Sequence, residues 1–276
     1  MISNKLEEQL KTVFNGKGKI TFLTGAGVSA ESGIPTFRGS DGYWTIGSKN
    51  YKPHEIATYK MFQKSPYEVW KWFLYMRSVC NSAKPNAGHM ALVEIEKLLG
   101  DRFTIITQNV DGLHLRAGNS IEGTFQAHGN INYMLCDKNC NLSIYPIPEN
   151  FPQKSRGDDL SKAEVEMLRC PDCGGITRPF ALLWDEYYNE VYYRVESCMK
   201  TAAATELLII AGTTGSTNIP NTVAQLVLKT GGIIFDINIE KNIFSEMAIN
   251  SGNGYFLQYP SGMVLPEMVK IFKECV

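Results

Sequence analysis

The segment 25–39, GAGVSAESGIPTFRG, follows directly on an apolar run at residues 20–23. A strand that leads through a Gly-x-Gly turn into a helix places backbone N–H groups and the positive end of a helix dipole where a pyrophosphate can bind. The segment lacks the third glycine of the common Rossmann fingerprint and the Gly-Lys-Ser/Thr ending of a P-loop. It predicts a dinucleotide site, with Gly25 and Gly27 as candidate cofactor residues.

Short apolar runs alternate with helical stretches along the rest of the chain. The runs 19–23, 103–107, 206–211 and 232–237 are typical of buried parallel strands, and helices are expected at 65–82, 87–99 and 220–229. This alternation predicts an α/β fold, a Rossmann-like doubly wound parallel sheet. The ligand crevice of such a sheet lies beyond the carboxyl ends of its strands, where the turns after residues 23, 107 and 211 converge.

Composition excludes several classes of protein. The chain has 276 residues, 44% of them apolar and 20% charged, and its net charge of -1 supplies no electrostatic footprint for nucleic acid. No apolar stretch approaches the roughly 20 residues that a membrane span requires, and the start, MISNKLEEQLKTVF, predicts an amphipathic helix rather than a signal peptide. We therefore expect a soluble, cytoplasmic enzyme without nucleic-acid or membrane partners; the oligomeric state is not predicted.

Four of the seven cysteines form two close pairs, Cys136 with Cys140 and Cys170 with Cys173. Paired thiols in an intracellular chain indicate one structural zinc ion held by four thiolates, which leaves no open position for chemistry. The C-x3-C spacing of the first pair lies within the range of zinc ribbons, although a degraded pair or a reversible disulfide is the alternative. The segment 130–177 has too few large apolar residues to fold alone, so zinc would stabilise it.

Two further segments complete a pattern. Residues 107–114 read TQNVDGLH after an apolar run, and an isolated His128-Gly129 follows. Together with the glycine segment and the cysteine pairs, these motifs resemble the sirtuins, the NAD-dependent protein deacylases of the Sir2 family. The resemblance extends from about residue 25 to residue 266.

The resemblance implies a reaction and roles for four residues. The acyl oxygen of a modified lysine attacks the nicotinamide ribose of NAD, nicotinamide leaves, and the acyl group is released as acyl-ADP-ribose. His128 is the expected base for a ribose hydroxyl, a task that suits an imidazole. Asn109 and Asp111 are expected to act on the carboxamide so that the glycosidic bond weakens, and Gln108 to hold a ribose hydroxyl. All four are also predicted cofactor contacts.

The remaining cofactor residues are carried over from the family motifs. Phe37 is expected to shield the reacting carbon from water and Arg38 to lie near the phosphates or ribose. The other predicted contacts are Ala26, Gly212, Thr213, Thr214, Asn238 and Ser261, of which Ser261 lies in a poorly matched stretch. Ser29 and Glu31 are expected at the start of the helix. Hydroxyl and carboxylate groups at that position cap the helix as often as they bind a ligand.

The chain departs from the family at its substrate-facing segments. Trp184-Asp185 replaces a Phe-Gly pair beside the acyl tunnel, and 214–220 lacks the usual leucine and valine. These departures leave two alternatives to a deacylase of acyl-lysine proteins or peptides: an ADP-ribosyltransferase or NAD glycohydrolase, and a non-catalytic NAD-binding module. Phe73 and Met76 occupy the positions of the Tyr-x-x-Arg pair that recognises acidic acyl chains, so an uncharged acyl group is favoured.

The resemblance also implies a domain organisation. The chain is expected to form one catalytic domain over 1–276. Its large Rossmann-like part comprises about 1–39, 85–129 and 178–276, and its small module comprises about 40–84, with the cofactor loop and helices, and 130–177, with the zinc.

Overall fold

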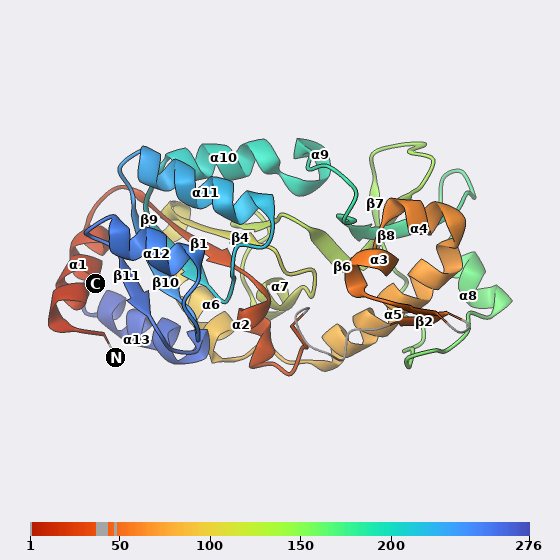
Figure 1. The fold of residues 1–276 in the computed structure, drawn as a ribbon, viewed down its shortest axis with the longest axis horizontal. Helices are drawn as coiled ribbons and strands as arrows, with labels where there is room; N and C mark the ends of the chain where they lie inside the picture. Colours follow the sequence, from red (N-terminus) through yellow and green to blue (C-terminus); the bar gives the residue numbers. More distant parts are fainter. Residues whose placement is uncertain (1, 37–43, 47–48) are drawn as a thin grey trace.

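The computed structural model describes residues 2–36, 44–46 and 49–276, arranged as a large part built on a six-stranded sheet and a smaller part beside it (Figure 1). The large sheet has the order β11-β10-β9-β1-β4-β5 and is parallel at every pairing. Its strands are β1 (Lys19–Thr24), β4 (Phe103–Thr107), β5 (Thr124–Gln126), β9 (Thr205–Ala211), β10 (Ile233–Ile237) and β11 (Tyr255–Leu257). Because the order reverses direction around β1, the sheet is doubly wound, which confirms the predicted fold class.

Helices cover both faces of this sheet. Ile20 and Phe22 of β1 belong to one apolar cluster, and Leu23 belongs to another, because successive strand side chains point to opposite faces. The first cluster is formed with α1 (Asn4–Asn15), α6 (Ala87–Leu99) and α13 (Ser261–Lys273), and the second with α10 (Val195–Ala203), α11 (Asn218–Lys229) and α12 (Ile243–Asn250). In Figure 1, α10 and α11 lie above the sheet and α6 and α13 below it.

The predicted elements of the large part are confirmed. The strands at 103–107 and helix 87–99 have the predicted bounds, and the other strands and helix 220–229 differ by one or two residues at an end. The amphipathic N-terminal helix is also present as α1, where Ser3 caps the first turn and Leu6 and Leu10 face the core. No helix in the described part of the chain is long and apolar enough to cross a membrane.

The smaller part combines a helical insertion with an antiparallel sheet of order β7-β6-β8. Its elements are β2 (Trp44–Ile46), β3 (Lys49–Tyr51), α3 (Pro53–Ile56), α4 (Tyr59–Lys64), α5 (Pro66–Ser82), β6 (Gly129–Cys136), β7 (Ile144–Pro146), α8 (Lys162–Met167) and β8 (Thr177–Ala181). Trp70 of α5 is fully buried, and its indole N–H donates to the Thr177 carbonyl oxygen at 2.7 Å. Segment 130–177 therefore shares an apolar core with α5 and does not depend on a metal alone. The domain bounds given above remain a prediction.

Short elements connect these parts: α2 (Ala26–Ala30) after β1, the 3-10 turn η1 (Gly100–Arg102) before β4, α7 (Leu113–Ala117) after β4, and α9 (Glu190–Tyr193) before α10.

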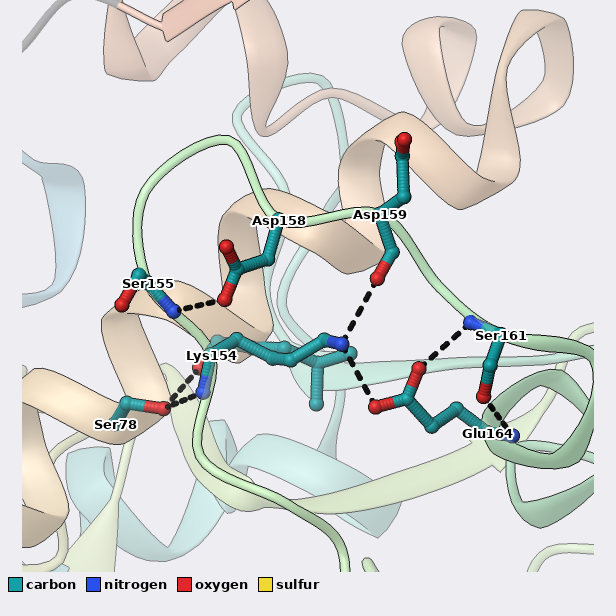
Figure 2. A network of polar contacts seen from close by, with 8 residues as sticks. Ser78, Lys154, Ser155, Asp158, Asp159, Ser161 and Glu164 are labelled. Atoms are coloured by element: carbon teal, nitrogen blue, oxygen red, sulfur yellow. Dashed lines mark hydrogen bonds and ion pairs between the residues drawn. The ribbon is translucent and has the colours of Figure 1, made fainter.

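A buried ion pair attaches the loop before α8 to the rest of the smaller part (Figure 2). The Lys154 ammonium donates to the Glu164 carboxylate at 2.7 Å and to the Asp159 carbonyl oxygen at 2.8 Å. The Lys154 backbone N–H donates to the Ser78 hydroxyl of α5 at 2.8 Å, and Glu164 also accepts from the Ser161 N–H at the start of α8. One lysine thus links the loop to both helices.

We predict that Lys154→Met destabilises the protein by about 2–4 kcal/mol, because Glu164 would keep a charge with little solvent around it. Both side chains of this pair are only 11% exposed. Urea unfolding followed by circular dichroism measures the change. Lys97→Met is the matched control, since Lys97 and Glu94 form an exposed pair for which a loss under about 0.5 kcal/mol is expected. Equal losses in the two variants would contradict the prediction.

Candidate active site and metal centre

The turns that follow β1 and β9 pack directly against each other. The Gly25 N–H donates to the Ala211 carbonyl oxygen at 3.0 Å, and the Gly27 N–H donates to the Gly212 carbonyl oxygen at 2.8 Å. The sequence predicted that this Gly-x-Gly turn leaves its N–H groups free for phosphate, and for these two groups that prediction was wrong. They extend the β1–β9 ladder beyond the strands, because two parallel neighbours that end together continue to pair.

Glycine is required at this contact for steric reasons. A Cβ on Gly27 would lie 2.7 Å from the Gly212 Cα, and a Cβ on Gly212 would lie 2.4 Å from the Val28 nitrogen. Gly212 also has a φ of +61°, a conformation that glycine adopts readily. Larger residues would separate the two turns.

Asn109 and Asp111 lie behind this contact and are both buried. The Asn109 amide donates to the Gly25 carbonyl oxygen at 3.0 Å and to the Ser29 hydroxyl at 3.1 Å. The Ser29 hydroxyl in turn donates to the Asp111 carboxylate at 2.7 Å, and the Leu113 N–H donates to its other oxygen at 2.8 Å. Burial raises the pKa of Asp111, and these two hydrogen bonds oppose the rise. The polar turn is therefore held rigidly against the glycine turn.

Ser29 thus has a different position from the one expected. It lies in the last turn of the short helix α2, where it is fully buried and caps nothing at the helix start. Its role is to join Asn109 to Asp111. The place of Ser29 in the glycine motif was the sequence signal that it belongs to the site. Its partners could not be predicted from that signal, because Asn109 and Asp111 are 80 and 82 positions away in the chain.

His128 has a polar partner on each ring nitrogen. Its Nδ1 lies 3.0 Å from the Gln108 carbonyl oxygen, and its Nε2 lies 2.8 Å from the Tyr188 hydroxyl. A carbonyl oxygen only accepts, so Nδ1 carries the proton and Nε2 is the acceptor. Burial lowers the pKa of His128 to about 4, although the bond to Gln108 opposes the shift. The imidazole is therefore neutral at physiological pH and presents a basic nitrogen.

Gln108 connects this histidine to the turn after β9. Its side-chain amide donates to the Thr213 hydroxyl at 3.0 Å, and its side-chain oxygen accepts from the Thr217 hydroxyl at 3.1 Å. The predicted residues Gln108, Asn109, Asp111, His128 and Thr213 are thereby brought together at the carboxyl ends of the sheet.

The adenosine-side candidates are less closely joined. The Asn238 amide donates to the Thr213 carbonyl oxygen at 2.7 Å, so Asn238 lies against the same turn. The Thr214 hydroxyl lies 3.4 Å from that of Ser216. Ser261 begins α13 and donates to the Glu31 carboxylate at 3.2 Å, an oxygen that also accepts from the Gly262 N–H. Phe37 and Arg38 lie outside the described residues.

The departure at Trp184-Asp185 has a structural explanation. The Asp185 carboxylate accepts from the Tyr59 N–H at 2.6 Å and from the Lys60 N–H at 3.0 Å. It satisfies the first turn of α4, where N–H groups lack helical partners. The Trp184 N–H donates to the Ala57 carbonyl oxygen at 2.9 Å. Asp185 therefore anchors this segment to the helical insertion instead of providing the flexibility of a glycine.

Two histidines outside the crevice are buried in neutral form. His89 accepts from the Asn86 N–H at the start of α6, and the His114 Nε2 lies 3.0 Å from the Thr24 hydroxyl at the end of β1. Their ring centroids are 4.9 Å apart. Burial lowers the pKa of His89 to about 4 and that of His114 well below its ordinary value. His114 therefore joins the turn after β4 to the end of β1, whereas His54 is exposed.

The sulfur atoms of Cys136, Cys140, Cys170 and Cys173 come within 4.8 Å of one another. The closest pairs, Cys136 with Cys173 and Cys140 with Cys170, are 3.6 Å apart, which is too long for the roughly 2.05 Å bond of a disulfide. Four sulfurs at about 2.3 Å around one tetrahedral zinc ion would lie about 3.8 Å apart, so the geometry fits a structural zinc site.

Asn139 explains how a C-x3-C spacing fits this site. Its φ is +48°, in the left-handed region that asparagine tolerates well, and its N–H donates to the Cys136 carbonyl oxygen at 3.1 Å. The extra residue is taken up in this turn. The Gly175 N–H then approaches the Cys173 sulfur at 3.4 Å from the second knuckle.

Comparison with known proteins gives a consistent result. Residues 25–218 match the model of the Sir2 family. The chain is 37% identical to an NAD-dependent protein deacylase of Leptospira interrogans over 91% of this chain and 92% of that protein, and 33% identical to one of Pyrococcus abyssi over 95% and 96%. The crystal structure of a Sir2 homologue with NAD has a TM-score of 0.79, with 32% identity over 98% of this chain and 95% of that one. A mutant Sir2 homologue with 2'-O-acetyl ADP ribose has a TM-score of 0.77, with 32% identity over 97% and 96%.

We predict that the protein loses stability as the pH falls from about 6.5 toward 4. The unfolded chain takes up protons on histidine near pH 6.5, whereas the folded chain keeps the buried rings neutral. His89→Gln should be less stable than the wild type at pH 7.5. Its free energy of unfolding should fall less steeply as the pH falls, with a slope about 1.4 kcal/mol per pH unit smaller than that of the wild type, because one proton fewer is taken up on unfolding. Urea unfolding between pH 4.5 and 7.5 measures this. His54→Gln, which leaves the buried rings in place, should decline like the wild type; an unchanged slope for His89→Gln would refute the prediction.

For the metal centre, we expect about one zinc ion per chain and its loss in Cys170→Ser, with a destabilisation of more than about 3 kcal/mol because the four-ligand site is broken. Elemental analysis and thermal unfolding are the measurements. Cys275→Ser is the matched control, since this thiol lies outside the cluster and should leave both quantities unchanged. Zinc-free wild-type protein of full stability would rule out the site.

Proposed function

The chain belongs to the Sir2 family, and from this premise we propose that it is an NAD-dependent protein lysine deacylase that releases nicotinamide and transfers the acyl group to ADP-ribose. The observation that carries the proposal is the position of His128. A neutral imidazole, oriented by the Gln108 carbonyl oxygen, presents its basic nitrogen at the carboxyl ends of the parallel strands. A dinucleotide binds at this place in doubly wound folds.

NAD, when bound, supplies the electrophilic ribose carbon and the leaving nicotinamide. At this site His128 would act as the general base, accepting a proton at Nε2 from a ribose hydroxyl of the bound cofactor. The backbone carbonyl at Nδ1 keeps the ring in the correct tautomer and stabilises the imidazolium that forms. Because the ring is buried, it is ready to accept a proton at any pH well above 4.

Asn109 and Asp111 bind and orient the nicotinamide end in this proposal. Both amide N–H groups of Asn109 are used by Gly25 and Ser29, so its side-chain oxygen is the group left to accept from a carboxamide. The hydrogen bonds to Asp111 fix the turn in advance, which favours catalysis because no reorganisation is needed on binding. Gly25, Ala26, Gly27 and 212–214 would line the phosphate and ribose path, with Phe37, Arg38, Asn238 and Ser261 as further cofactor contacts.

The substrate is proposed to be an acyl-lysine protein or peptide. The relatives from Leptospira and Pyrococcus are named as protein deacylases, which supports this class. The Asp185 anchor is consistent with this class, because it holds the segment after β8 against α4. An uncharged acyl group is favoured, since Phe73 and Met76 belong to the apolar cluster of the smaller part.

Zinc is assigned a structural role, because all four of its positions are taken by thiolates. A cytoplasmic location is part of the proposal, since unbridged thiols belong to a reducing compartment.

The test is incubation of the protein with NAD and an acetyl-lysine peptide, followed by mass spectrometry. We expect peptide-dependent formation of acetyl-ADP-ribose. His128→Ala should lower the rate at least 100-fold, the ordinary contribution of a general base, while NAD still binds. Nicotinamide release without peptide would favour an NAD glycohydrolase, transfer of ADP-ribose to protein would favour an ADP-ribosyltransferase, and NAD binding without turnover would favour a binding module. Each would overturn the deacylase proposal.

A further inference from the structure

The two segments in which the chain departs from the family pattern contact the neighbouring residues Gln108 and His128. Tyr188 follows the Trp184-Asp185 departure and lies with its hydroxyl 2.8 Å from the His128 Nε2. Thr217 lies in the 214–220 departure. The same Thr217 donates to the Gln108 side chain. Gln108 is therefore linked to both departures: its side chain bonds to Thr217, and its carbonyl oxygen bonds to His128, which bonds to Tyr188.

The direction of the Tyr188 bond follows from the histidine tautomer. Since the His128 Nδ1 carries the proton, Nε2 has one lone pair and accepts from the phenol. Burial raises the pKa of Tyr188, so the phenol stays protonated and remains a donor. A neutral imidazole has no second lone pair to offer. The phenol thus occupies the atom that must accept a proton from the ribose.

The backbone on both sides holds the phenol in place. Before it, the Glu186 carboxylate accepts from the Arg178 guanidinium and from the Leu183 N–H at 2.8 and 3.0 Å. After it, the Asn189 side chain caps α9 by accepting from the Tyr192 N–H at 2.8 Å. Tyr188 therefore lies between two residues, Glu186 and Asn189, whose side chains are hydrogen-bonded to the protein.

We propose that Tyr188 is a positioning residue that holds the basic nitrogen of His128 in the ligand-free enzyme, and that the ribose hydroxyl of the dinucleotide competes with its phenol for that nitrogen. This inference rests on the proposed function. It implies that ribose binding breaks one hydrogen bond of the resting site, and that the strength of this bond limits affinity for the ribose.

A double-mutant cycle on ADP-ribose binding tests the competition. Tyr188→Phe removes the hydroxyl and keeps the ring, so the dissociation constant of ADP-ribose should fall about fivefold, the equivalent of one net hydrogen bond of about 1 kcal/mol. In the His128→Ala background the same change should have no effect, because the contested nitrogen is absent. Isothermal titration calorimetry measures all four proteins.

Tyr187→Phe is the matched control. The neighbouring Tyr187 side chain is 91% exposed, so loss of its hydroxyl should leave ADP-ribose binding and acyl transfer unchanged. Thermal unfolding checks that each variant is folded. If Tyr188→Phe does not fold, Tyr188→Met repeats the cycle with a flexible apolar side chain.

Unchanged or weaker ADP-ribose binding by Tyr188→Phe would overturn the inference, as would an equal gain in the His128→Ala background. If the wild type forms acyl-ADP-ribose and binds ADP-ribose, such a result removes only the role of Tyr188. If the wild type does neither, the proposed function fails and this inference fails with it.

Discussion

The close contact between the turn after β1 and the turn after β9 is the constraint on which the rest of the site depends. Three glycines allow it, since a Cβ on Gly25, Gly27 or Gly212 would lie less than 3.0 Å from atoms of the opposite turn or its neighbours. Asn109 then reaches the Gly25 carbonyl oxygen, while Gln108 and Asn238 reach Thr213. If the turns moved apart by the width of a methyl group, these bonds could not all form together.

Several polar groups of the site are hydrogen-bonded to one another. Ser29 joins Asn109 to Asp111, and Tyr188 occupies the basic nitrogen of His128. Such a network is rigid because each buried group would otherwise lose hydrogen bonding to water. A ligand hydroxyl that bonds to the His128 Nε2 must therefore replace the Tyr188 hydroxyl there. The net gain per exchange is small, so selectivity comes from which bonds the ligand can replace.

Three separate sets of contacts hold the smaller part together and position the segment that carries Tyr188. The four cysteines bring the end of β6 close to the turn before β8. The Trp70 indole joins α5 to β8, and the Asp185 carboxylate joins the segment after β8 to α4. The segment that carries Tyr188 follows directly after Asp185. Its position thus depends on the helical insertion as much as on the zinc module.

The sequence by itself determined the type and order of the main elements, because apolar periodicity and glycine turns are local properties of the chain. It also predicted the cluster of four cysteines from their spacing, and resemblance made His128 the candidate base. It did not show that the Gly25 and Gly27 N–H groups bond to the neighbouring turn, that Ser29 joins Asn109 to Asp111, or that Asp185 caps α4. Only the tertiary structure decided these points and the meeting of Tyr188 with His128. Each is a contact between residues 60 to 186 positions apart in the chain, and the direction of a hydrogen bond across such a distance is set by how the strands and helices pack.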